Sequence, residues 1–158
     1  MSVLMTACGG DDDSGSLGDL QLVGIDFELN SIILANQGAD EVRTQGLWVY
    51  QDGESSEFNI FIIEPRTEIL FSVQDIGGVD PSGGEIALFD SESFSNPDAV
   101  LEYVAWGSSG HTGMDVAIEA GQWNEEGAVE TGPDTLVVVR ADPNLIGPDA
   151  WIPSDELP

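Results

Sequence analysis

The sequence contains no lysine and three arginines, against 30 aspartates and glutamates. The formal net charge is −27 over 158 residues. Such a charge repels phosphate backbones and anionic lipid head groups, which argues against nucleic-acid binding and against adsorption to a membrane through a basic patch. It favours cations and basic partners. Two interpretations of the acidity remain open: it keeps an exported domain soluble, or it reflects a saline habitat in which salt screens self-repulsion over about 8–10 Å.

Catalytic chemistry is restricted by one histidine, one cysteine and the absence of lysine. Schiff-base chemistry needs a lysine, and a Cys/His zinc site or an internal disulfide needs more than Cys8. A Ser/His/Asp set would have to combine His111 with Ser108 or Ser109 and with Asp115, and no G-x-S-x-G motif is present. We therefore expect no catalytic residues and no enzyme activity.

Carboxylates are numerous enough to suggest calcium, yet no complete calcium-binding motif is present. The EF-hand pattern that starts at Asp90 fails, because Phe94 takes its fifth position and Ser95 stands where glycine is required. The remaining candidates for an irregular calcium site share two acidic loops: Asp75 and Asp80 in one, and Asp52, Glu54 and Glu57 in the other. We expect no metal ion or other cofactor as a resident group.

A sugar-binding platform is the other alternative, because aromatic side chains can stack on sugar rings. Buried core positions are the more common role of tryptophan. The four tryptophans are Trp48, Trp106, Trp123 and Trp151. The alternative function is therefore a calcium- or carbohydrate-dependent adhesion domain.

The first residues resemble the end of a bacterial lipoprotein signal, in which an apolar residue and small residues lead into a cysteine. The matching run is Leu4-Met5-Thr6-Ala7-Cys8. The resemblance implies a lipid group on the thiol of Cys8. A complete signal has a basic start and an apolar stretch of about 7–15 residues, so we interpret residues 1–8 as a truncated signal and residues 9–19 as a flexible acidic tether. No other stretch of about 20 apolar residues is present, which makes Cys8 the expected anchor to a membrane of the cell envelope, outside the cytoplasm.

Residues 20–158 have the pattern of one all-β domain. Val23, Ile25, Phe27 and Leu29 alternate with polar residues or glycine, as in a half-buried strand. Residues 84–110 predict two paired strands, 85–89 and 100–106, and Asp52-Gly53 predicts a tight turn. Residues 111–123 have an ambiguous period, which we interpret as a short strand or turn, and residues 142–158 as an extended tail with Trp151 packed on the domain.

About eight to nine short strands, separated by turn residues and without a long amphipathic helix, predict a β-sandwich. The pattern resembles the lamin-tail domain, an immunoglobulin-like sandwich that also occurs in secreted and surface bacterial proteins. The segments similar to that family are Ile32 to Gly38, Val42 to Tyr50, Gly83 to Asp90, Val100 to Gly107 and Gly147 to Trp151. The resemblance implies no catalytic set; it implies a module for interaction or architecture whose protein or surface-polymer partner is unknown.

Overall fold

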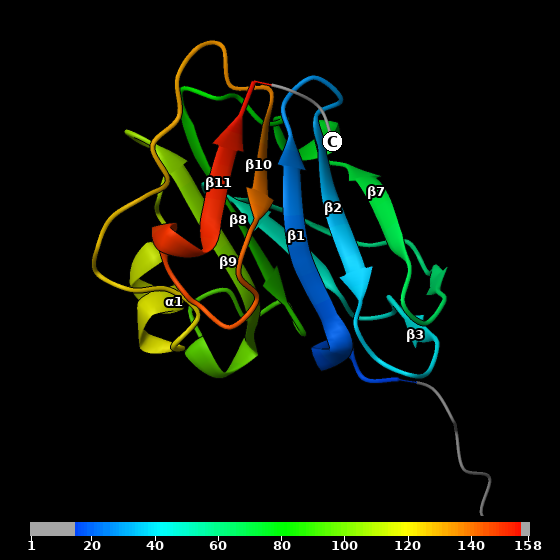
Figure 1. Cartoon of the computed structure of the whole chain (residues 1–158). Coiled ribbons are helices and arrows are strands. Elements are labelled where there is room, and N and C mark those ends of the chain that lie inside the picture. Colours follow the sequence, from blue (N-terminus) through cyan, green and yellow to red (C-terminus); the bar gives the residue numbers. More distant parts are fainter. Residues whose placement is uncertain (1–14, 156–158) are drawn as a thin grey trace, which may run out of the picture.

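Eleven strands form two facing sheets and a short extra pair within residues 15–155, the part of the chain that this computed structural model describes (Figure 1). The first sheet has the order β11-β10-β1-β2-β7. Its strands are β1 (Leu20–Asp26), β2 (Ser31–Asn36), β7 (Glu68–Ser72), β10 (Val137–Arg140) and β11 (Trp151–Ser154). The second sheet has the order β5-β4-β8-β9, with β4 (Trp48–Gln51), β5 (Glu54–Glu57), β8 (Gly83–Phe89) and β9 (Val100–Gly107). The extra pair consists of β3 (Val42–Arg43) and β6 (Ile62–Ile63).

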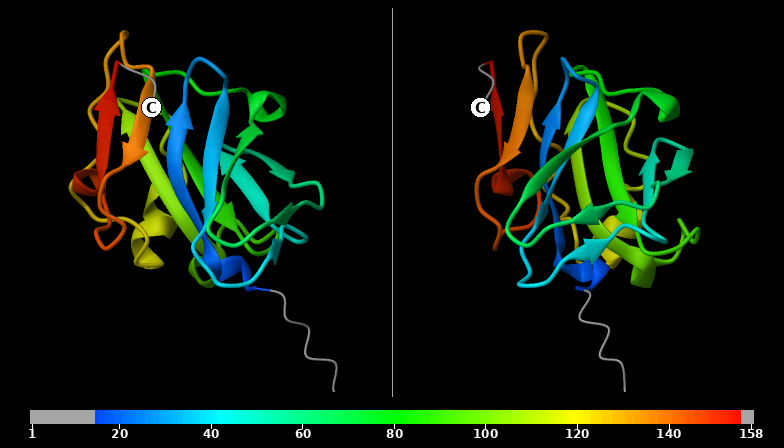
Figure 2. Two further views of the ribbon diagram at one scale, coloured as in Figure 1. Left: turned by 45° about the vertical axis from the view of Figure 1, so that its right-hand side comes forward. Right: turned by 90° about the vertical axis from the view of Figure 1, so that its right-hand side faces the viewer.

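The two sheets face each other as two layers, which the right-hand view of Figure 2 shows from the side. Phe27, which follows β1, packs edge-on against Trp106 of β9, with 5.5 Å between the ring centroids. Aliphatic side chains on the inner faces of both sheets are completely buried: Leu22, Ile25, Ile32 and Leu34 in the first, and Ile86, Leu88 and Val104 in the second. The predicted all-β sandwich is confirmed.

The predicted centre of the fold is present. β8 and β9 pair antiparallel from Gly83↔Gly107 to Phe89↔Val100, and the 3₁₀ helix Pro97–Ala99, capped by Asn96, leads into β9. The Asp52-Gly53 turn is also formed, joining β4 to β5. Both of its residues have positive φ, 44° and 90°, as the tight turns of β-hairpins require.

A β-bulge in β1 corrects the predicted alternation. Leu22 lies opposite Leu34, but Gly24 lies opposite Ile33, so Val23 is an extra residue between two registers. The bulge switches the side chains to the other face. Leu22 and Ile25 therefore both point into the core, Val23 is half-buried, and Leu29 lies beyond the strand with 57% of its surface exposed.

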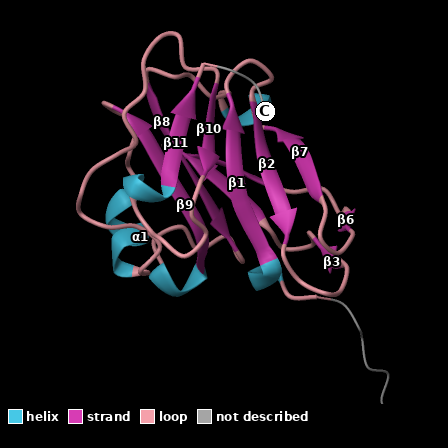
Figure 3. Cartoon of the chain, in the orientation of Figure 1, coloured by secondary structure: helices cyan, strands magenta, loops and turns pink. Residues whose placement is uncertain are grey.

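Within residues 111–123, predicted as a short strand or turn, residues 114–119 form a helix and turns flank it. α1 (Met114–Glu119) packs against β9 on the outer face of the second sheet (Figure 3). Ala117 is buried there, and the buried ring of Trp123 contacts Tyr103 at 5.3 Å. The helix is too short to establish a period in the sequence, and its conformation is selected by this packing.

The carboxyl-terminal segment is part of the first sheet, which corrects the prediction of an extended tail. β11 pairs with β10 from Arg140↔Trp151 to Val137↔Ser154. Trp151 is buried, as predicted. Because β11 is the end strand of its sheet, Pro153 is compatible with it even though proline has no N–H to donate.

The amino-terminal predictions fall largely outside the described residues. Cys8 and the predicted signal are among those outside. Within the range predicted as a tether, the Gly15 N–H donates to the Glu41 carbonyl at 2.7 Å, and Ser16 and Asp19 form a reciprocal cap of the 3₁₀ helix Leu17–Asp19. Within residues 15–155, no helix has the length and apolar character needed to cross a membrane.

Candidate binding site

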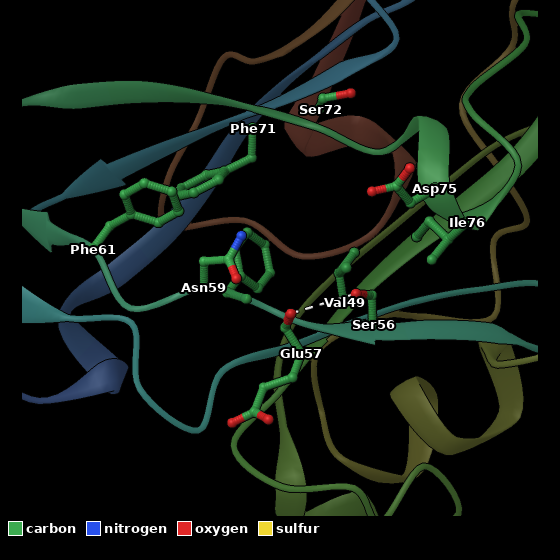
Figure 4. Close-up of a pocket in the computed structure, with 10 residues that line it drawn as sticks. Val49, Ser56, Glu57, Asn59, Phe61, Phe71, Ser72, Asp75 and Ile76 are labelled. Atoms are coloured by element: carbon green, nitrogen blue, oxygen red, sulfur yellow. Dashed lines mark hydrogen bonds between the residues drawn. The ribbon is translucent and has the colours of Figure 1, made fainter.

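A pocket of about 270 Å³ lies between the two sheets (Figure 4). It is at the side where β5 is the last strand of one sheet and β7 is the last strand of the other. Its walls come from β4, β5, β7, the segment after β5 and the 3₁₀ helix Gln74–Ile76. The lining residues are Val49, Ser56, Glu57, Phe58, Asn59, Phe61, Phe71, Ser72, Asp75 and Ile76. The pocket therefore joins segments that lie up to 27 positions apart in the sequence.

Three phenylalanines form one wall of the pocket. Phe71 of β7 stands edge-on to Phe58, with ring centroids 4.6 Å apart and planes at 87°, and it lies 5.2 Å from Phe61. Phe58 is buried, whereas 44% of the Phe61 surface is exposed. Phe61 is thus an exposed ring that packs against Phe71, and an exposed aromatic ring can pack against a ligand.

A carboxylate lies across the pocket from this aromatic wall. Figure 4 shows Asp75 opposite Phe61 and Phe71, while Glu57 turns its carboxylate away from them. Asp75 is exposed and belongs to the 3₁₀ helix Gln74–Ile76, which is held in place by the buried side chain of Ile76. Aromatic faces and a carboxylate both attract positive charge. The arrangement suits a cationic group with an apolar stem.

The loop residues considered for calcium are separated by the fold. Asp75 faces the pocket, whereas Asp80 accepts a hydrogen bond from the Ser82 N–H at 2.8 Å. Hydrogen bonds from Ser82 lower the pKa of Asp80. Among residues 15–155 no three histidine, cysteine or acidic side chains gather as metal ligands would.

The His111 side chain is hydrogen-bonded to the backbone. Its Nε2 lies 2.7 Å from the Trp106 carbonyl oxygen. Because a carbonyl oxygen accepts, that nitrogen carries the proton and cannot take one from Ser108 or Ser109. The nitrogen is therefore not the base of the Ser/His/Asp set weighed from the sequence.

The tryptophans contribute to the interior. Trp106, Trp123 and Trp151 are buried, and Trp48 is half-buried. The Trp106 indole N–H donates to the Asp80 carbonyl at 2.8 Å. A platform of exposed tryptophans is not formed by these residues.

Sequence reasoning did not single out Glu85, whose side chain is completely buried. Its Oε2 accepts a hydrogen bond from the Tyr103 hydroxyl at 2.6 Å, and its Oε1 accepts from Thr112 Oγ1 at 3.0 Å. The Gly113 N–H lies 3.0 Å from both oxygens, and the Asp52 N–H donates to Oε1 at 3.2 Å. Glu85 thus ties the β4–β5 turn and the start of α1 to the second sheet. The only signal in the sequence is a charge inside an apolar strand.

Tyr103, which donates a hydrogen bond to the Glu85 carboxylate, is itself neutral. Burial raises the pKa of the Tyr103 phenol, and the nearby Glu85 carboxylate raises it further. The phenol therefore remains a donor throughout the physiological pH range.

A second interior carboxylate links the two sheets. Glu102 of β9 lies 2.7 Å from Nη1 of Arg140 in β10, and the Arg140 guanidinium lies 5.8 Å from the centre of the Trp151 ring. Burial raises the pKa of Glu102 to about 7, although the Arg140 charge opposes the shift. Both residues are remote in sequence, so nothing local predicts the pair.

Comparisons with family models, with curated proteins and with solved structures gave no match for the chain. The sequence does not indicate that the phenylalanines of the pocket form one cluster, because Phe58 and Phe61 meet Phe71 through tertiary packing alone.

Proposed function

We propose that this protein is a non-enzymatic interaction module of the cell envelope, held to a membrane by lipid on Cys8 and presenting the β5–β7 pocket to a partner. The observation that carries the binding function is Asp75 facing Phe61 and Phe71 across a pocket that Phe58 also lines. The net charge of −27 adds a long-range attraction for a basic partner. The ligand group in the pocket is a cation with an apolar stem.

The lamin-tail assignment is part of the same proposal. Its support is the order of the similar segments along the chain, several of which are strands of the sandwich, among them β8 and β9. A domain of this kind acts as a scaffold that displays a surface. That role agrees with a site placed at sheet edges.

Benzylammonium is a suitable probe, with benzyl alcohol as a neutral compound of similar shape. We expect benzylammonium to cause saturable amide chemical-shift changes in residues 58–61 and 71–76, because its ring can stack on the phenylalanines while its charge faces Asp75. Benzyl alcohol should bind more weakly. Equal affinity for the two compounds, or shifts spread over the whole surface, would contradict the proposal.

Two variants test whether benzylammonium binds in the pocket. Asp75→Asn removes the facing charge and should weaken benzylammonium binding several-fold, while leaving benzyl alcohol binding unchanged. Glu119→Gln removes one charge from the exposed side of α1 and is the matched control. If both variants weaken binding equally, the attraction comes from overall charge and not from the pocket.

The anchor is tested separately. The chain is expressed behind a complete lipoprotein signal, and cells are fed an alkyne-tagged fatty acid. Label and membrane association are expected for the wild type and should disappear in Cys8→Ser. An unlabelled wild-type protein would contradict the lipid anchor without affecting the pocket.

A further inference from the structure

The outer side of β7 carries backbone groups that no strand pairs with. The Val73 N–H donates to the Asn30 carbonyl, and β7 pairs with β2 in the register Ile32↔Phe71 and Leu34↔Ile69. Antiparallel pairs alternate, so Ile69, Phe71 and Val73 direct their N–H and C=O groups toward β2. Leu70 therefore directs its own N–H and C=O away from β2, toward the free edge of the sheet.

The other end strands of the two facing sheets, within the described residues, are protected. β11 contains Pro153, and β5 carries Glu54 and Glu57 with two serines between them. β9 is covered by residue Val129, whose N–H donates to the Ala105 carbonyl and whose carbonyl accepts from the Gly107 N–H. Proline, charge and covering segments are the usual protections of an edge strand. β7 has a single charge, Glu68, and no proline.

Exposed apolar side chains occur on β7 and on the segment that packs against it. Leu70 exposes 53% of its surface, and Ile60 and Ile62, both exposed, flank Phe61, which contacts Phe71 of β7. Large exposed apolar side chains near an open strand edge are compatible with an interaction surface. The inner face of β7 at Phe71 opens directly into the pocket.

We propose that an extended basic segment of a partner protein adds to the free edge of β7 as a further strand and places a lysine or arginine side chain in the pocket. This inference rests on the proposed function of the pocket. Side chains of a strand alternate between its faces. A segment of alternating apolar and basic residues therefore sets its apolar side chains beside Leu70 and its cations facing Asp75.

Charge decides between this occupant and a second copy of the chain. Two copies would bring together net charges of −27 each, whereas a basic segment is attracted to the same edge. Salt weakens the first repulsion and the second attraction alike. Peptide binding should therefore decrease with salt. If the edge takes a basic strand and not a second copy, sedimentation should show a monomer even at high salt, where the repulsion between copies is screened.

The test uses a fluorescent seven-residue peptide of alternating valine and lysine, and two versions N-methylated at all valines or at all lysines. In an antiparallel pair the valine opposite Leu70 uses its N–H, so methylation of the valines should reduce affinity about tenfold or more while methylation of the lysines is tolerated. The reverse selectivity indicates parallel addition. Equal affinity of all three peptides would overturn strand addition and leave the pocket proposal intact.

A protein variant provides the matching evidence. Leu70→Pro removes the outward N–H and should weaken peptide binding about tenfold without changing benzylammonium binding, whereas Leu70→Thr keeps the N–H and should retain most of the affinity. If Leu70→Pro does not fold, the methylated peptides still decide. Salt-dependent dimers that disappear in Leu70→Pro would overturn the proposal in favour of a second copy.

Discussion

Glu85 and Glu102 are acidic side chains in the interior of the domain, and their positions and partners differ. Glu85 lies beneath α1 on the outer face of the second sheet, whereas Glu102 lies between the two sheets. Glu85 accepts hydrogen bonds from neutral donors, whereas Glu102 faces the guanidinium of Arg140. A buried acid is compatible with folding only when such partners replace water. Glu85 thus links the β4–β5 turn and the start of α1 to β8 and β9, and Glu102 links β9 to β10.

Glu102 should make stability depend on pH. Burial raises its pKa in the folded state to about 7, above the ordinary value of 4.5, so between these pH values the folded state holds a proton that the unfolded state has released. The free energy of unfolding therefore decreases as pH rises through this interval, by up to about 3 kcal/mol.

Urea unfolding of wild type and Glu102→Gln from pH 4 to pH 8 measures this contribution. The stability of the wild type relative to the variant should decline over the interval and become constant above it. A constant difference at every pH would show that Glu102 titrates normally.

Glu85→Gln should destabilise the protein by about 2–3 kcal/mol, because one acceptor becomes a donor that faces other donors. The same urea assay measures the loss, and exposed Glu119→Gln should change stability by less than about 0.5 kcal/mol. An equal effect of the two substitutions would show that the Glu85 hydrogen bonds contribute nothing net.

At the scale of elements, backbone details set the strand faces and strand ends. The bulge at Val23 turns the first half of β1 to the opposite face, which allows Leu22 and Ile25 to share the core. Gly107 ends β9 with φ of 67°, and there its Cα lies against the backbone of Ser82 and Gly83. The end of β9 is thus fixed by close contact as well as by φ.

Gly107→Ala and Gly46→Ala separate the effect of positive φ from the effect of the close backbone contact. Gly46 also has positive φ, 79°, but a Cβ there meets nothing within 4 Å, so its substitution should cost about 1–2 kcal/mol. Gly107→Ala adds a clash with the Ser82 carbonyl and should cost about 2 kcal/mol more. Thermal unfolding measures both, and equal losses would show that the close contact relaxes without cost.

At the scale of the whole molecule, the net charge of −27 opposes compaction. We expect the melting temperature to rise by several degrees between about 0.01 M and 1 M sodium chloride, because the Debye length falls from about 30 Å to about 3 Å. Differential scanning calorimetry checks this. A melting temperature independent of salt would show that self-repulsion is negligible.

Calcium and magnesium chlorides at equal ionic strength provide the control for specific binding. Both divalent ions screen charge equally, so the two salts should raise the melting temperature equally if calcium has no site of its own. A larger stabilisation by calcium than by magnesium would instead support the adhesion alternative, with calcium bound at an irregular acidic site. At a calcium concentration of 100 times its Kd, such binding adds about 2.7 kcal/mol to the free energy of unfolding.

The sequence by itself determined the all-β class, the central β8–β9 pair and the Asp52-Gly53 turn, because alternation and turn chemistry act between neighbouring residues. It did not determine α1, the Val23 bulge or β11, whose conformations depend on the surface that each one packs against. The pocket with Asp75 and the buried Glu85 also needed the tertiary structure. Their partners come from distant segments, and only the facing of two sheets brings such residues within contact distance.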